Sequence, residues 1–138
     1  MIDPAHVPPV DPQEMLARYV LYRRYVRSSD QTVRPEAFIP HPHVALSVTR
    51  HREASEAEIW DVGAQVARGQ SKTLYGRADL PAQACTAEGL RVVEAPVAAN
   101  PNHANITGWP SERPQQKMIA MVIAEKARYV SDPPQSQP

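Results

Sequence analysis

Residues 43–50 alternate between two kinds of side chain, and this alternation limits what the chain can fold into more than any other feature. Val44, Leu46 and Val48 share one parity, while polar or small residues occupy the other. Because successive side chains of a strand point to opposite faces, this period of two predicts a strand with one buried face. Arg50 continues the buried parity, so its stem should be partly buried and its guanidinium should need an acceptor.

A helix start follows the predicted strand within a few residues. Ser55 and Glu58 have the spacing of a capping box, in which the Ser hydroxyl bonds one orphan amide and the Glu side chain bonds another. Gly69 supplies a stop signal. The pattern predicts a helix at about 55–68 with residues at helical spacing facing the core, namely Ile59, Val62, Gly63 and Val66.

The remaining predicted elements add strands and a second main helix. Further strand patterns occur at 73–78, 90–94 and 103–107, and a helical pattern occurs at about 113–129. Strands and helices mingled with short connections are typical of an α+β domain. We therefore expect an α+β fold, a small mixed sheet of about four strands with two main helices, and disordered Pro-rich ends.

Proline and polar residues dominate both ends of the chain. Such segments bury too little apolar surface to offset the entropy lost on ordering. We expect a flexible N-terminal segment at 1–11, a single α+β domain at 12–130 and a flexible C-terminal tail at 131–138. Both ends should then be removable with little loss of stability.

The segment from 12 to 27 gives conflicting signals. Asp11-Pro12-Gln13-Glu14 is typical of a helix start, with an acceptor, a proline in the first turn and a glutamate after it. Residues 18–22 are instead rich in strand formers. We predict a helical turn near 12–17 and a strand near 18–26, and a single helix over 12–27 is the alternative.

Composition narrows the class of protein. Basic and acidic residues number 15 each, and this balance argues against a dedicated nucleic-acid binder. No apolar run approaches the roughly 18 residues of a membrane span, and no secretory signal is visible, so we expect no membrane contact and a cytoplasmic location. Cys85 stands alone, which excludes an intrachain disulfide. No glycine-rich phosphate loop appears, and we expect no cofactor.

Several short motifs are spread over about residues 18–125. They are Leu46-Ser47-Val48-x-Arg50, Glu58-Ile59-Trp60, Gly76-Arg77-Ala78-Asp79, and His103-Ala104-Asn105-Ile106 followed by Gly108-Trp109-Pro110. Together they resemble a family of small uncharacterised bacterial single-domain proteins. The resemblance implies a bacterial origin and a single-domain fold, and it implies no activity.

His41-Pro42-His43 is the first candidate for chemistry. An extended chain would place both imidazoles on one face about 7 Å apart at the backbone, which suits joint metal ligation. A solvated Pro-rich loop carrying two exposed histidines explains the same residues without a ligand. We expect no metal site there.

Arg50-His51-Arg52 is the second candidate, because the passage from a strand to a helix N-terminus favours anions. Glu53 and Glu56 crowd the same turn, however, and a local ion-pair cluster explains the arginines equally. We expect a carboxylate partner for Arg50, either Asp79 or Glu58.

Residues 100–109 supply the remaining candidates. His103 and Asn105 could orient a ligand from a loop, while a histidine bonded to a backbone carbonyl is the structural alternative. Trp109 is either an exposed binding anchor or a lid on the core. The sequence identifies no catalytic residue.

An uneven charge distribution and the lack of a nucleophile or acid–base constellation suggest a function in binding. Residues 18–52 are rich in arginine, whereas residues 53–61 carry acidic charges alone. We predict a cytosolic bacterial accessory protein that binds another protein without catalysis. The alternative is a small enzyme or ligand-binding domain that acts on a nucleotide or other anion through Arg50, Arg77 and His103.

Overall fold

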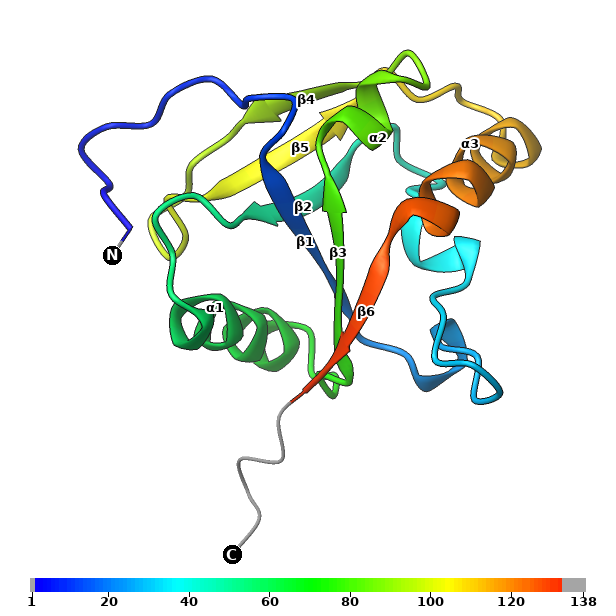
Figure 1. Cartoon of the computed structure of the whole chain (residues 1–138), viewed down its shortest axis with the longest axis horizontal. Helices are drawn as coiled ribbons and strands as arrows, with labels where there is room; N and C mark the ends of the chain where they lie inside the picture. The colour runs from blue at the N-terminus through cyan, green and yellow to red at the C-terminus, as the bar shows by residue number, and fades with distance from the viewer. Residues whose placement is uncertain (1, 133–138) are drawn as a thin grey trace, which may run out of the picture.

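Six antiparallel strands form one twisted sheet in the computed structural model, which describes residues 2–132 (Figure 1). The strand order across the sheet is β4-β5-β2-β1-β3-β6. The strand bounds are β1 Met15–Val20, β2 Leu46–Arg50, β3 Gly76–Pro81, β4 Arg91–Glu94, β5 His103–Thr107 and β6 Arg128–Ser131. The α+β class is confirmed, but the expected mixed sheet of four strands is wrong, because every pairing is antiparallel and six strands take part.

The two main helices lie on opposite sides of this sheet (Figure 1). The two main helices are α1 Glu56–Gly69 and α3 Arg113–Lys126. Shorter helical turns are η1 Arg23–Tyr25, η2 Pro35–Phe38 and α2 Gln83–Thr86. Two main helices were expected, and the capping box of Ser55 and Glu58 at the start of α1 is present as predicted.

The last strand was missed because the last helix was expected to continue to residue 129. The helix ends at Lys126, and Ala127 already has an extended backbone with a ψ of 148°. Arg128–Ser131 then pairs with β3, so part of the expected C-terminal tail belongs to the sheet. The amide of Asp132 donates to the carbonyl of Tyr75, and the rest of that tail, residues 133–138, lies outside the described residues.

The segment from 12 to 27 resolves into a turn, a strand and a 3-10 turn. The amide of Glu14 donates to the carbonyl of Asp11, and β1 begins directly afterwards at Met15. The single helix over 12–27 is therefore wrong, and the predicted strand near 18–26 begins and ends too late. β1 pairs with β3 along its whole length, from Met15↔Pro81 to Val20↔Gly76. This long-range pairing overrides the local helix signal.

The strands β1 and β2 separate like the arms of a fork. Their pairing extends only over Leu16↔Arg50 and Ala17↔Thr49. Beyond Ala17, β1 stays with β3, whereas the rest of β2 pairs with β5. The fork leaves backbone groups near Ser47 without a strand partner, and those groups need other donors or acceptors.

One face of the sheet carries the main hydrophobic core. Leu16, Leu80 and Ile106 point to this face and are fully buried beneath α2, α3 and η2. The opposite face is more polar and is covered by α1 over β1 and β3. There the Tyr19 hydroxyl donates to the Ile59 carbonyl at 2.6 Å. A Cβ at Gly63 would lie 2.7 Å from the Tyr19 ring, so glycine is needed for this close packing.

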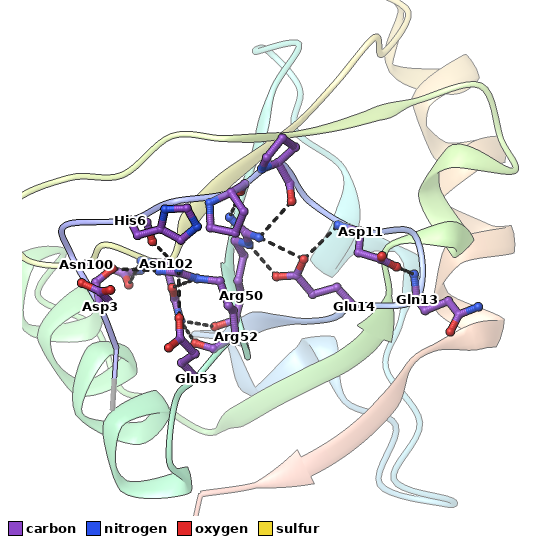
Figure 2. Close-up of polar contacts among 12 residues, drawn as sticks. Asp3, His6, Asp11, Gln13, Glu14, Arg50, Arg52, Glu53, Asn100 and Asn102 are labelled. Atoms are coloured by element: carbon purple, nitrogen blue, oxygen red, sulfur yellow. Dashed lines mark hydrogen bonds and ion pairs between the residues drawn. The ribbon is translucent and has the colours of Figure 1, made fainter.

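The N-terminal segment runs over the end of β2 and accepts hydrogen bonds from two arginines (Figure 2). Arg50 is only 1 % exposed, and its guanidinium donates to the carbonyls of Pro8 and Pro9. Arg52 donates to the carbonyls of His6 and Asp3. We expected residues 1–11 to have nothing to pack against, and residues 2–11 instead supply acceptors to buried charges.

Arg50 has a carboxylate partner, as expected, but that partner is Glu14. Two guanidinium nitrogens of Arg50 donate to the two carboxylate oxygens of Glu14. Neither predicted partner takes this role, because Asp79 bonds His51 and Arg77, and Glu58 belongs to the capping box. The error has a simple cause: the pairing Leu16↔Arg50 places the residues preceding β1 beside the end of β2.

The first prediction concerns the Arg50–Glu14 pair. Glu14→Gln leaves a buried guanidinium without its counter-charge, so it should lower the free energy of unfolding by about 3 kcal/mol. Adding Arg50→Met removes the unpaired charge and should restore part of that loss. Chemical denaturation of the two single variants and the double variant measures this coupling. Single losses that simply add would contradict it.

The second prediction concerns the N-terminal segment. Deleting residues 1–9 removes four carbonyl acceptors from Arg50 and Arg52. The melting temperature should fall by more than about 4 °C, which corresponds to about 1 kcal/mol in a domain of this size. Deleting residues 1–5 is the control, since it leaves the acceptors of Arg50 in place. Equal small losses in both deletions would show that the segment contributes nothing.

Candidate functional site

The structure does not bring Arg50, Arg77 and His103 together. Arg50 lies on the core face, at the end of β2 and under the N-terminal segment. Arg77 lies on the opposite face and is covered by α1, where its guanidinium carbon is 4.8 Å from the centroid of the Trp60 ring. Of the three residues, only His103 lines the cleft that lies between α1 and the fork of β1 and β2, called the principal cleft here. A common anion pocket built from all three is therefore absent from residues 2–132.

Two carboxylates, those of Glu56 and Asp79, compensate the charge of Arg77. It makes two hydrogen bonds with Glu56, at 2.8 and 2.9 Å, and two with Asp79, at 2.9 and 3.2 Å. Burial alone would lower the pKa of Arg77, but these carboxylates outweigh it and the pKa is raised. His51 Nε2 lies 3.0 Å from the same Asp79 carboxylate. This group is an ion-pair cluster that fastens the start of α1 to β3, and it offers no free cation.

Of the remaining residues near the predicted loop, Trp109 and Asn102 have structural roles, and Asn105 lies outside the cleft. Trp109 is 5 % exposed and its Nε1 donates to the Ile106 carbonyl, so it closes the core rather than projecting from it. Asn105 is half-buried on β5, opposite Ser47, and does not line the principal cleft. Asn102 bonds the carbonyls of Arg50 and Arg52 and is fully buried.

The principal cleft lies where the fork between β1 and β2 meets α1. Its volume is about 390 Å³. The sheet contributes Tyr19, Ser47, Thr49 and His103, and α1 contributes an apolar edge formed by Val62 and Val66. Besides Arg18, the other lining residues come from β2, from α1 and its C-terminal end, and from the segments after β1, around η2 and before β5. They are Leu21, Tyr22, Tyr25, Glu36, Ile39, Val48, Gln65, Gln70, Val97, Ala99 and Asn100. A largely apolar hollow of this size with a few polar groups is typical of a small-molecule site.

Arg18 is the cationic side chain of this cleft and bridges the fork. Its Nε donates to the Ala37 carbonyl at 2.9 Å, and its Nη1 donates to the Ser47 carbonyl at 3.0 Å. These bonds satisfy the backbone that the fork exposes. Within residues 2–132, no carboxylate forms an ion pair with Arg18, and its Nη2 donates to no protein atom.

The charge of Arg18 is therefore uncompensated. Burial lowers the pKa of Arg18 to about 10, which still leaves the guanidinium protonated at neutral pH. Glu36 is the acidic residue among those that line the cleft, and its carboxylate is paired at 3.8 Å with Lys117. A half-buried cation without a counter-charge favours binding of an anion beside it.

His103 supplies a second polar group at the β5 side of the cleft. Its Nδ1 lies 2.8 Å from the carbonyl of Ala95, as expected for a histidine at a strand start. A carbonyl only accepts, so Nδ1 carries the proton and Nε2 is the acceptor in the neutral ring. His103 can therefore accept a hydrogen bond from a ligand hydroxyl or amine.

Sequence reasoning missed Arg18, although the signal was the one used for Arg50. Arg18 shares the parity of Leu16 and Val20, both fully buried in β1, so an arginine on an apolar face was visible in the sequence. The ambiguity between helix and strand hid that parity. Tyr22 was considered only as a residue of the ambiguous segment 12–27, and Tyr25 was not singled out.

Comparison with known proteins assigns this chain to no family. No protein-family profile, curated protein or solved structure matches the chain. The resemblance to small uncharacterised bacterial proteins therefore stays a prediction. Within the described part of the chain, no helix is long and apolar enough to cross a membrane, and no three His, Cys, Asp or Glu side chains are grouped to hold a metal ion.

The third prediction follows from Asp79. Burial raises the pKa of Asp79, but its bonds with His51 and Arg77 outweigh burial and lower the pKa overall. A carboxylate with a lowered folded pKa stabilises the fold above its unfolded pKa, near 3.8, and loses that contribution as pH falls through the folded value. The free energy of unfolding should thus decline below about pH 4.

Asp79→Asn should flatten this acid limb of the stability curve and lower stability at pH 7. Denaturant titrations at a series of pH values between 3 and 7 measure the change. Asp61→Asn is the matched control, since Asp61 is exposed on α1 and takes no part in the cluster. An unchanged acid limb in Asp79→Asn would contradict the role given to this carboxylate.

Proposed function

We propose that this protein binds a small organic anion in the cleft between α1 and the fork of β1 and β2. The observation that carries the proposal is Arg18, a charged guanidinium that faces the cleft without a carboxylate partner among residues 2–132. The other two candidate arginines differ, because Arg50 and Arg77 each have carboxylates in place.

The surroundings of Arg18 favour a ligand with an apolar body. Val62, Val66 and Ile39 supply apolar surface, while Tyr22 and Tyr25 supply aromatic rings. Burial of the body would contribute most of the affinity, and the guanidinium would fix the orientation of the anionic group. The proposal follows the ligand-binding alternative from the sequence, but Arg18 replaces Arg50 and Arg77 as the cation beside His103.

The fourth prediction tests the site with 1-anilinonaphthalene-8-sulfonate, an aromatic anion whose fluorescence rises in apolar surroundings. We expect saturable binding to the folded protein. Arg18→Gln should weaken it about tenfold, because a hydrogen bond to a charged group contributes roughly 1.5–3 kcal/mol. Ser47→Trp should block the cleft, since Ser47 is exposed on its floor.

Val93→Trp is the matched control for the added indole. Val93 lies in the same cross-strand row as Ser47 and Asn105, is 41 % exposed and does not line the cleft. The Val93→Trp variant should bind the dye as tightly as the unmodified protein does. Circular dichroism and melting temperature confirm folding of each variant. Equal dye binding in all variants would place the dye elsewhere and refute the proposed site.

A protein partner, which was the first prediction from the sequence, is the second candidate function. Met118 and Met121 favour it, because they lie one turn apart on α3 and are 69 % and 49 % exposed. Methionines adapt to varied surfaces and recur at binding faces. Such a surface would be independent of the cleft, so Ser47→Trp would leave it intact.

A further inference from the structure

A cluster of cations and tyrosines forms one rim of the cleft. The Arg24 guanidinium carbon and the Lys72 Nζ each lie 4.6 Å from the centroid of the Tyr22 ring. Arg24 also lies 5.4 Å from the Tyr25 ring. Tyr22 and Tyr25 line the cleft, whereas Arg24 and Lys72 do not, so the two cations contact residues that a bound ligand would touch. We name Tyr22, Arg24, Tyr25 and Lys72 the cationic rim.

The positive charges of the rim have no counter-charges. No ion pair joins Arg24 or Lys72 to a carboxylate within residues 2–132. Because both cations lie 4.6 Å from one ring centroid, they are within about 9 Å of each other. Like charges at this separation repel, and the tyrosine faces offset only part of that cost. A bound anion would relieve the repulsion.

Tyr25 links Arg18 with the rim, because Arg18 and Tyr25 both line the cleft and the Tyr25 ring lies 5.4 Å from the Arg24 guanidinium carbon. Tyr25 interacts electrostatically with Arg18 and also lies beneath Arg24. Lys72 lowers the pKa of Tyr22 through a hydrogen bond, which again reflects excess positive charge at this end of the cleft. A carboxylate carries one negative charge and is satisfied by Arg18 alone, whereas Arg18 together with the two cations of the rim suits an anion of higher charge.

We propose that the anionic group bound here is the phosphate of an aromatic phosphate monoester. The aromatic body would occupy the apolar part of the cleft, and the phosphate would lie between Arg18 and the cationic rim. A phosphate monoester carries a charge of about −1.5 to −2 at neutral pH and offers three acceptor oxygens. Mononucleotides are one common form of such a ligand. This inference rests on the proposed function and specifies its ligand class.

The test compares 1-naphthyl phosphate with 1-naphthoate by isothermal titration calorimetry at low ionic strength. The two probes share an aromatic body and differ in the charge of the anionic group. The phosphate should bind at least tenfold more tightly at pH 7.5. The preference should shrink at pH 5, because the second phosphate proton, with a pKa near 6, is then bound.

Variants separate the rim from the cleft. Arg24→Gln with Lys72→Gln should abolish the preference for phosphate while leaving naphthoate affinity within about threefold, since an exposed charge contributes little to a ligand that it does not contact. The matched control is Arg91→Gln with Arg113→Gln, two exposed arginines that neither line the cleft nor lie over the Tyr22 or Tyr25 ring. This control should keep the full preference. Inorganic phosphate should compete with 1-naphthyl phosphate.

The outcomes distinguish the two proposals. Equal affinity for the two probes, or a preference that survives loss of Arg24 and Lys72, overturns the phosphate assignment and leaves the cleft as an anion site. Binding of either probe that Ser47→Trp does not weaken overturns the cleft itself. A single-stranded oligonucleotide that binds more tightly than 1-naphthyl phosphate, and still binds Ser47→Trp, would show that the rim serves a nucleic acid instead.

Discussion

The early end of pairing between β1 and β2 determines most of what is distinctive in this structure. Two strands at the centre of a sheet would ordinarily bond along their length, yet these share only Leu16↔Arg50 and Ala17↔Thr49. The remainder of each strand is bonded to its other neighbour, β3 or β5. The backbone exposed in the fork must find partners, and Arg18 supplies them through the Ser47 and Ala37 carbonyls. A cation is thereby fixed at the base of a cleft.

Compensation of charge separates the structural arginines from the candidate binding arginine. Arg50 and Arg77 are more deeply buried than Arg18, and both have carboxylates positioned on their nitrogens. Such pairs roughly offset the cost of removing the ions from water. Arg18 bonds only neutral carbonyls, and Arg24 and Lys72 rest on tyrosine rings. Within the described residues, the cations at this end of the cleft thus have no carboxylate partner.

The elements that were predictable from sequence are those whose signals are local. The alternation in β2 and the capping box of α1 each involve residues close in the chain, and β5 was predicted at the bounds that it has. Long-range pairing decided the rest. Residues before Met15 have a helix-start pattern, but the chain forms β1 because it pairs with β3. The strand β6 was not predicted because its strand-forming residues directly follow α3 and were assigned to that helix.

The partners of the arginines depended on register in the same way. Glu14 is far from Arg50 in sequence, and only the pairing Leu16↔Arg50 brings them together. The parity rule correctly required an acceptor for Arg50 and could not identify it. The same rule would have selected Arg18 if β1 had been placed at its true bounds. The sequence could therefore identify individual residues of the candidate site. It could not show which residues lie together, because that depends on strand register.

The position of α1 explains why the cleft remains open. Gly63 lets the helix approach the Tyr19 ring, where any added Cβ would lie 2.7 Å from ring carbon. The Glu56–Arg77–Asp79 cluster and the Trp60–Arg77 contact hold the start of the helix over β3. With α1 fixed over β1 and β3, the α1-facing sides of β2 and β5 are only partly covered, and Ser47 and His103 line a hollow there. A larger residue at position 63 would collide with the Tyr19 ring, so this glycine determines how closely α1 can approach the sheet beside that hollow.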